Sequence, residues 1–309
     1  MKVYHGIEKF EPPQFAVVTT GTFDGVHSGH VEILNRIKSL AQQNEGETVV
    51  VTFDPHPRTV IHPDIDIKLL HTIEEKIDRL DKAGIDHFVI IPFTKEFSRT
   101  SSLTFVRDIL IRELQTKLLV IGYDHQFGRN REGSIIELEE FSRMYDFQIE
   151  QIEAQTFEDI NISSTKIRKA LEKGDVATAN VFLGYDFMIN GEVVHGFKKG
   201  KSIGFPTANI SVSNSNKIIP ASGVYAVEVS LKGKLYGGML NIGNKPTIGD
   251  KLEKSIEVHI FNFDEDIYGT SVQVNFKKRI RSEKKFENIG ALGAQLEKDQ
   301  SEVLEILGL

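Results

Sequence analysis

The sequence predicts two folded parts: a doubly wound α/β domain with a mostly parallel sheet, then a small antiparallel β-barrel with a terminal helix. Up to about Gly184, short apolar runs alternate with segments of helical periodicity. After Gly184, strand patterns follow one another with no helix pattern between them. The change predicts domains at residues 1–184 and 185–309, each long enough to bury its own core.

Four runs in the first part are short, rich in Val and Ile and almost continuously apolar, which is typical of parallel strands covered on both faces. These runs are Phe15–Thr20, Thr48–Phe53, Phe88–Pro92 and Leu118–Ile121. Helix patterns lie among and after them, at Val31–Leu40, Ile73–Ala83, Phe105–Leu114 and Ile135–Tyr145. This alternation predicts strand–helix–strand units and therefore a parallel sheet.

The second part is predicted to consist of strands joined by turns. Its strand patterns are Phe187–Val194, Gly223–Leu231, Lys234–Leu240, Ser255–Phe263 and Ser271–Phe276. Lys232-Gly233 separates two of them and predicts a two-residue hairpin turn. A helix pattern from about Phe286 to Leu307 ends the chain. The order predicts a compact antiparallel barrel followed by one helix.

Composition excludes several classes of protein. The 309 residues carry 37 Lys and Arg against 44 Asp and Glu, a net charge of -7, whereas non-specific binding to nucleic acid or to an anionic membrane needs a basic face. The chain has no cysteine, so disulfides, thiolate metal sites and cysteine nucleophiles are excluded. No apolar run approaches the ~18–20 residues of a membrane span, and Met1–Gly6 begins no signal peptide. We expect a soluble, cytoplasmic protein without nucleic-acid or membrane partners.

A glycine-rich turn from Gly21 to His30 joins the first buried strand to the next helix pattern. Ligands of open α/β sheets bind at the carboxyl ends of strands, where glycines admit a phosphate and a helix N-terminus favours negative charge. His27 and His30 in such a place can stabilise charge at a phosphorus atom. The alternatives are a turn with two incidental histidines, or a zinc pair, which lacks a third ligand nearby.

Ile162–Arg168 predicts the start of a later helix that can bind phosphate. Ser163 or Ser164 can cap this helix, its first N–H groups can meet a phosphate, and Arg168 can bind one through two nitrogens. A plain helix cap is the alternative interpretation. The combination with the histidine turn, in this order, is more specific than either motif alone.

The segment His195–Asn209 combines glycines and lysines with a Thr/Asn pair. Glycines let a loop surround phosphates, and lysines neutralise their charge. Thr207 and Asn209 alternate along one strand face, so their oxygen atoms can hold Mg²⁺. A solvated basic loop is the alternative.

The first two motifs resemble those of a known superfamily. Gly21–His30 resembles the H-x-G-H signature of nucleotidyltransferases, and Ile162–Arg168 resembles their I-S-S-T-x-I-R motif. Phe53–Arg58 and Gly122–Arg129 are similar to the FAD synthetase branch, although His125 stands where that branch usually has Phe. The resemblance implies a nucleotidyltransferase-type sheet with His27 and His30 catalytic. It implies nucleotide contacts from Gly21, Phe23, Asp24, Gly29, Ser163, Ser164, Thr165 and Arg168, and flavin contacts from His56, Pro57, Asp124 and Phe127.

The later segments resemble riboflavin kinases. Pro206–Asn209 matches their P-T-A-N element, and Ile256–Phe261 contains their E-V-H element. The resemblance implies that Glu257 is the base that activates the riboflavin hydroxyl, although a glutamate on the solvent face of a strand is the plainer alternative. It also implies Mg²⁺ at Thr207 and Asn209, ATP contacts from Gly200, Lys201 and Gly204, and flavin contacts from Asn241 and Arg281, with Lys201 standing where arginine is more usual.

Together, the two resemblances cover nearly the whole chain, which is identified as a member of the bacterial bifunctional riboflavin kinase/FAD synthetase family. The family implies phosphorylation of riboflavin by ATP to FMN, then adenylylation of FMN by a second ATP to FAD with release of pyrophosphate, with Mg²⁺ as cofactor. Two other functions stay open. One is nucleotidyl transfer to another phosphate ester, such as a pantetheine or nicotinamide nucleotide, and the other is flavin sensing without catalysis.

Overall fold

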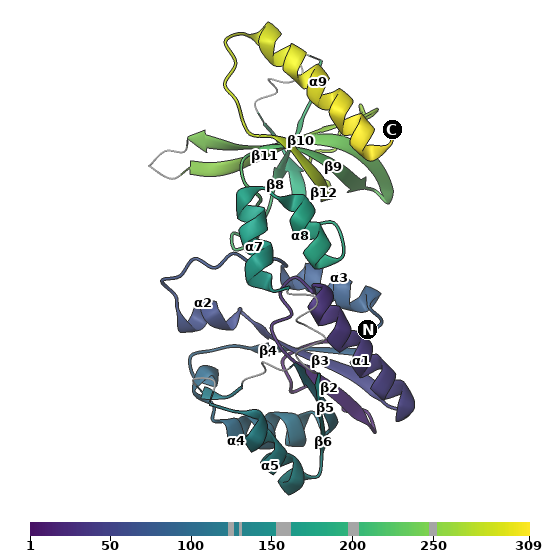
Figure 1. Cartoon of the computed structure of the whole chain (residues 1–309), viewed down its shortest axis with the longest axis vertical. Helices are drawn as coiled ribbons and strands as arrows, with labels where there is room; N and C mark the ends of the chain where they lie inside the picture. The colour runs from purple at the N-terminus through teal and green to yellow at the C-terminus, as the bar shows by residue number, and fades with distance from the viewer. Residues whose placement is uncertain (123–126, 130–131, 153–161, 197–203, 247–251) are drawn as a thin grey trace. The chain divides into compact units, whose positions relative to one another are not determined.

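The computed structural model describes residues 1–122, 127–129, 132–152, 162–196, 204–246 and 252–309. The chain forms two compact units, Met1–Ser163 and Ser164–Leu309 (Figure 1). The division falls before Gly184 because two helices that precede Gly184 belong to the second unit. The boundary that the sequence places after Gly184 stays a prediction about which segments each activity needs.

The first unit contains a six-stranded, wholly parallel sheet in the order β1-β4-β3-β2-β5-β6. Its strands are β1 (Lys2–His5), β2 (Ala16–Thr20), β3 (Glu47–Asp54), β4 (His87–Pro92), β5 (Thr116–Gly122) and β6 (Gln148–Ile152). The chain runs from β2 outward to β4 on one side and from β5 to β6 on the other. The loop after β2 therefore lies at the switch point of the sheet, where ligands of such folds bind.

Helices cover both faces of this sheet, as continuous apolar strands require (Figure 1). One face packs against α1 (Ser28–Gln43) and α3 (Ile73–Lys82), and the other against η2 (Phe105–Glu113) and α5 (Ile135–Tyr145). Shorter elements are α2 (Pro57–Ile61), η1 (Phe97–Arg99) and α4 (Ser102–Thr104). The predicted doubly wound parallel sheet is confirmed.

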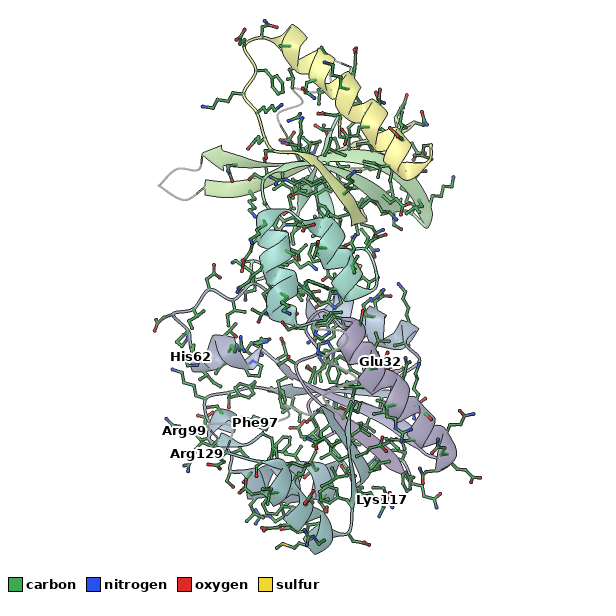
Figure 2. The ribbon with its side chains drawn as sticks, viewed as in Figure 1. Glu32, His62, Phe97, Arg99, Lys117 and Arg129 are labelled. Atoms are coloured by element: carbon green, nitrogen blue, oxygen red, sulfur yellow. The ribbon has the colours of Figure 1, made fainter. Side chains whose placement is uncertain are left out.

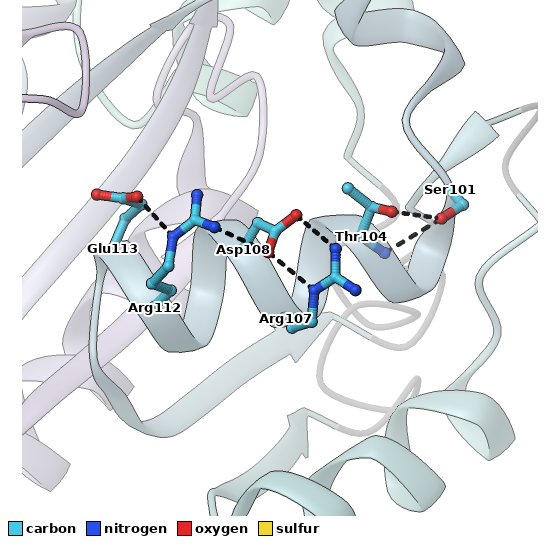
Figure 3. A network of polar contacts seen from close by, with 6 residues as sticks. All are labelled: Ser101, Thr104, Arg107, Asp108, Arg112 and Glu113. Atoms are coloured by element: carbon cyan, nitrogen blue, oxygen red, sulfur yellow. Dashed lines mark hydrogen bonds and ion pairs between the residues drawn. The ribbon is translucent and has the colours of Figure 1, made fainter.

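Helix η2 differs from the expected α-helix because it is wound as a π-helix that continues α4. Ser101 caps α4 by accepting the N–H of Thr104 at 3.1 Å (Figure 3). Farther along, Asp108 accepts two hydrogen bonds of 2.9 Å from Arg107 and one of 3.2 Å from Arg112 (Figure 3). The guanidinium of Arg107 lowers the pKa of Asp108, but such exposed pairs add little to stability.

The second unit contains a closed antiparallel barrel in the order β10-β11-β8-β7-β12-β9. Its strands are β7 (Met188–Val194), β8 (Ala208–Ser211), β9 (Gly223–Leu231), β10 (Lys234–Pro246), β11 (Leu252–Ile260) and β12 (Ser271–Arg281). Its helices are α7 (Ser164–Lys173), α8 (Val176–Leu183) and α9 (Ile289–Leu307). The barrel, the hairpin turn at Lys232-Gly233 and the terminal helix confirm the predicted architecture, although α8 was not expected.

Burial alternates along β11 and the first part of β12, as a filled interior requires. On β11, Ile256, Val258 and Ile260 are buried, whereas Glu257 and His259 are half-buried on the opposite face. Helix α9 packs on the outer face against a small apolar cluster from β9, β10 and the end of β11. Within the described residues, no helix is long and apolar enough to cross a membrane.

Candidate active sites

The stacked imidazoles of His27 and His30 lie where β2 passes into α1. His27 is the N-cap of α1 and His30 lies in its first turn. Their ring centroids are 3.7 Å apart with an interplanar angle of 17°, and the Phe23 ring lies 5.0 Å from that of His30. Gly21 directly follows β2, and Gly29 is buried in the first turn of the helix. The structure therefore gathers these predicted residues on one turn at the switch point.

The backbone of this turn is held in an uncommon shape by burial and by Asp24. Phe23 and Val26 are buried with φ angles of 45° and 37°, in the left-handed region that side chains rarely adopt. The buried Asp24 carboxylate accepts the backbone N–H groups of Leu70 and His71 at 3.0 and 3.1 Å. Asp24, predicted as a nucleotide contact, thus ties the turn to the segment that precedes α3.

Three basic side chains act on the pKa of His30. Burial, followed by the charges of His27, Lys76 and His71, lowers the pKa of His30 well below 6.5, so its ring is neutral near pH 7. Its Nδ1 atom is buried without a hydrogen-bond partner among the described residues. The sequence motifs did not include Lys76 and His71, although a lysine within the apolar face of the α3 pattern was a usable signal. Negative phosphate entering here would favour the charged forms of these basic groups.

An aromatic cluster follows the carboxyl ends of β3 and β4. It consists of Phe53, Phe93, Phe97, Phe105 and Phe127, with neighbouring ring centroids 5.6–6.5 Å apart. His56 accepts a backbone N–H at 3.2 Å and caps α2, whose first residue is Pro57. Figure 2 shows Phe97, Arg99 and Arg129 close to one another in the first unit, away from Glu32. Of the predicted flavin contacts, Phe127 belongs to this cluster.

The predicted phosphate motif lies where the two units meet along the sequence. Ser163 is the last residue of the first unit, and Ser164 begins α7 in the second. Thr165 is exposed and Arg168 half-buried in the first turns of this helix. The predicted helix start is confirmed, and the phosphate contacts stay a prediction.

Three predicted kinase residues form one row across the barrel wall. In the strand register, Glu257 of β11 lies opposite Asn209 of β8 on one side and opposite Asn241 of β10 on the other. Residues directly opposite in an antiparallel sheet point to the same face. Asn209, Glu257 and Asn241 therefore share the outer face, although the sequence separates them widely.

The segment before β8 is hydrogen-bonded to residues of β11. Thr207 Oγ1 donates to Glu257 Oε2 at 3.4 Å, and the His259 Nδ1 atom lies 2.7 Å from the carbonyl oxygen of Pro206. Gly196 lies against the Asn209 amide so closely that a Cβ atom at Gly196 would come 2.0 Å from Nδ2. The hydroxyl, the amide and the carboxylate thus form one oxygen-rich group on the outer face of the barrel.

The remaining predicted residues differ in what the structure says of them. Arg281 forms a bidentate pair with the buried carboxylate of Asp299 on α9, with nitrogen–oxygen distances of 2.6–3.0 Å, so much of its guanidinium is occupied. Gly204 is exposed, with φ +83°. Asp124, His125, Gly200 and Lys201 lie outside the described residues.

Comparisons with known proteins identify two families along the chain. The FAD synthetase family matches residues 9–166 and the riboflavin kinase family matches residues 183–307. The bifunctional riboflavin kinase/FMN adenylyltransferase of Bacillus subtilis is 38% identical over 296 residues, covering 94% of this chain and 92% of the relative. That of Escherichia coli is 35% identical over 312 aligned positions, covering 100% and 99%.

A solved structure shares the fold of the whole chain. The crystal structure of a protein from Streptococcus pneumoniae, named a macrolide-efflux protein, is 29% identical, with a TM-score of 0.86 over 97% of this chain and 98% of that one. The two matching families follow each other along the sequence, and the relatives are similar over nearly their full length. The chain therefore belongs to the family of bifunctional riboflavin kinase/FMN adenylyltransferases.

Proposed function

We propose that this enzyme phosphorylates riboflavin with ATP to give FMN, and then transfers AMP from a second ATP to FMN to give FAD and pyrophosphate. The row of Asn209, Glu257 and Asn241 carries the kinase half of the proposal. The stacked His27 and His30 at the switch point support the adenylyltransferase half. The match of the riboflavin kinase family to residues 183–307 supports the proposal that the second half of the chain carries the first reaction.

In the kinase reaction, Glu257 accepts the proton of the riboflavin hydroxyl. The hydroxyl oxygen forms a bond to the γ-phosphorus of ATP, the bond from this phosphorus to the β–γ bridging oxygen breaks, and ADP leaves. Asn241, which lies opposite Glu257 in the same row as Asn209, is proposed to orient the flavin beside this carboxylate. Positioning of the two substrates supplies much of the rate increase.

Thr207 and Asn209 are proposed to hold Mg²⁺. Their hydroxyl and amide oxygens are donors of the kind that Mg²⁺ prefers, and Thr207 already contacts Glu257. Among the residues that the structure describes, no three His, Cys, Asp or Glu side chains gather as a metal site. This fits an ion that takes few protein ligands and completes its shell with water and phosphate. When bound, Mg²⁺ neutralises charge on the transferring phosphates.

In the adenylyltransferase reaction, His27 and His30 are proposed to stabilise charge at the α-phosphorus of ATP. A phosphate oxygen of FMN forms a bond to this phosphorus, and the bond to the pyrophosphate oxygen breaks. A neutral His30 can donate one N–H, and negative phosphate nearby favours uptake of a second proton. Ser164, Thr165 and Arg168 are proposed to bind the phosphates that leave as pyrophosphate.

The aromatic cluster beyond β3 and β4 is proposed to receive the flavin of FMN. Flat aromatic rings pack well against the faces and edges of neighbouring rings. Phe53, Phe93 and Phe97 are half-buried, so the cluster presents some of its surface outward. His56 and Pro57, at the start of α2, are proposed to border the same pocket.

The test incubates riboflavin, ATP and Mg²⁺ with the enzyme and separates the flavins by chromatography. His27→Ala and His30→Ala should slow FAD formation about 10²–10³-fold while FMN still accumulates, because each removes a group that stabilises charge. Glu257→Gln should slow FMN formation about 10²–10⁴-fold while supplied FMN is still converted to FAD. Glu265→Gln, an exposed carboxylate on another part of the barrel, is the control.

The results also decide between the alternatives. An enzyme that makes no FMN from riboflavin and ATP, or that adenylylates another phosphate ester instead of FMN, would refute the assignment. Binding of flavin with no turnover at all would favour flavin sensing. Parent rates in both histidine variants would remove these residues from the adenylyltransferase mechanism.

A further inference from the structure

Lys76 is buried on the apolar face of α3, and its amino group reaches the turn that carries the two histidines. Its neighbours on this helix face, Ile73, Ile77 and Leu80, pack into the core beneath the sheet, and Lys76 itself is only 6% exposed. A long charged side chain is rarely buried in this way unless its end has polar partners. The burial of Lys76 therefore implies that its amino group has polar partners.

The amino group is bonded to the histidine turn. Lys76 Nζ donates to the carbonyl oxygen of Thr22 at 2.7 Å and lies 3.4 Å from the hydroxyl oxygen of Thr52 on β3. The Thr52 hydroxyl in turn donates to the same Thr22 carbonyl at 3.2 Å. The Thr22 carbonyl thus accepts hydrogen bonds from α3 and from β3. Phe23, the next residue, has its backbone in the left-handed region.

A second link joins the same two segments. Asp24, two residues after Thr22, accepts N–H groups from Leu70 and His71, which immediately precede α3. The segment from Leu70 to Lys76 therefore holds the turn at two points that lie on either side of Phe23. A turn with strained residues keeps its shape only where the surroundings define it strongly.

The charged groups around the turn come from the same two segments. His30 faces His27 from its own helix, and His71 and Lys76 from the segment across the turn. The charges of Asp24 and Asp54 oppose the effect of burial on the pKa of Lys76. Removal of the Lys76 amino group would therefore change both the turn and the electrostatic surroundings of His30.

We propose that Lys76 is a positioning residue of the adenylyltransferase, which holds the Thr22 carbonyl and thereby fixes the turn that presents His27 and His30 to ATP. The inference rests on the proposed function of this histidine pair. Lys76 acts through the turn and has no role in the kinase. A purely structural lysine would affect stability alone and would leave kcat/KM for FAD formation by the folded enzyme unchanged.

The test compares Lys76→Met with Lys38→Met in the full chain. Lys38 is a matched control because its Nζ also donates to a backbone carbonyl, that of Ala83, at 2.9 Å. Lys76→Met should reduce kcat/KM for FAD formation by about 10- to 100-fold, the effect of losing a hydrogen bond from a charged donor, while riboflavin phosphorylation stays at the parent rate. Lys38→Met should leave both activities unchanged.

A second readout follows the His30 ring directly. Histidine titration by NMR, with the His30 signal assigned from His30→Asn, should show the pKa of His30 rising in Lys76→Met, because one repelling positive charge is gone. Lys76→Arg keeps the charge and the donor groups, so it should keep the low pKa of His30 and regain part of the activity. If Lys76→Met does not fold, Lys76→Gln decides by the same two measurements.

The outcomes separate the two proposals. If His27→Ala and His30→Ala lose FAD formation but Lys76→Met behaves like Lys38→Met in rate and in the pKa of His30, the role of Lys76 is refuted and the proposed function stands. If the histidine variants keep the parent rate, the proposed function of the turn is refuted, and the role of Lys76 that rests on it is refuted too. Loss of FAD formation with an altered His30 titration in Lys76→Met supports both.

Discussion

Removing α7 and α8 from the second unit should strongly destabilise the kinase barrel, because α8 is bonded to the start of β7 and to β12. The Asn180 side chain donates to the carbonyl of Phe276 at 2.7 Å and to Asp186 at 3.1 Å, and it accepts the N–H of Phe187 at 2.7 Å. A fragment that starts at Tyr185 loses Asn180 and all three hydrogen bonds. A fragment that starts at Ser164 keeps them.

The size of the effect follows from what these two helices bury. Val176 and Leu183 are 0% and 1% exposed, and full burial of such a side chain contributes about 1.5–3 kcal/mol. The backbone groups of Phe187 and Phe276 lose hydrogen bonds with a net value of about 1 kcal/mol each. The total of about 5–8 kcal/mol is comparable to the whole stability of many domains, which is ~5–15 kcal/mol.

Urea denaturation followed by circular dichroism measures this difference between fragments 164–309 and 185–309. The longer fragment should unfold cooperatively and make FMN from riboflavin and ATP, and it should make no FAD because it lacks His27 and His30. The shorter fragment should unfold at much lower urea or be unfolded in buffer. Equal midpoints for the two fragments would refute the reasoning and would support the boundary that the sequence places after Gly184.

Three further changes have defined outcomes. Asp299→Ala leaves the half-buried Arg281 guanidinium without its buried carboxylate partner, so it should lower the free energy of unfolding by about 3–5 kcal/mol in urea titrations, and an unchanged midpoint would contradict the pairing. Because the pKa of His30 is lowered in the folded protein, the unfolded chain takes up a proton there first as pH falls below about 6.5. As pH falls through this range, the free energy of unfolding should therefore decrease less steeply in His30→Asn than in the parent. Parallel curves of stability against pH for the two proteins would argue against a neutral, buried ring. Thr207→Ala and Asn209→Ala should raise the Mg²⁺ concentration needed for half-maximal kinase rate, and an unchanged requirement would remove them as ligands.

The sequence predicted the central strands of the first unit but missed the two at its edges. The central strands are covered on both faces, so their residues form nearly continuous apolar runs. β1 (Lys2–His5) and β6 (Gln148–Ile152) are partly exposed and mix polar with apolar residues, which leaves no run to detect. The π-helical winding of η2 was equally hidden, because a helix pattern shows which residues face the core and not which carbonyl each N–H binds.

The two candidate sites differ in how much of each a local motif contains. His27 and His30 are neighbours in sequence and in space, so a motif and its place after a buried strand were sufficient. The kinase row joins Asn209, Glu257 and Asn241 from three strands, and only resemblance to a family linked them before the register was known. The pairing of Arg281 with Asp299 is of the same kind, since nothing local indicates a carboxylate on α9.

Lys76 shows what a motif leaves out of a candidate site. The residue lies 54 positions from Thr22, outside every motif, yet its amino group bonds directly to the histidine turn. The sequence did contain a sign of this, because a lysine that interrupts the apolar face of an amphipathic helix must direct its charge to a buried polar partner. The pattern does not identify the partner of such a lysine, since the partner depends on which strand lies beside the helix. The carbonyl that it binds follows only from the strand order β4-β3-β2, which places α3 beside the turn after β2.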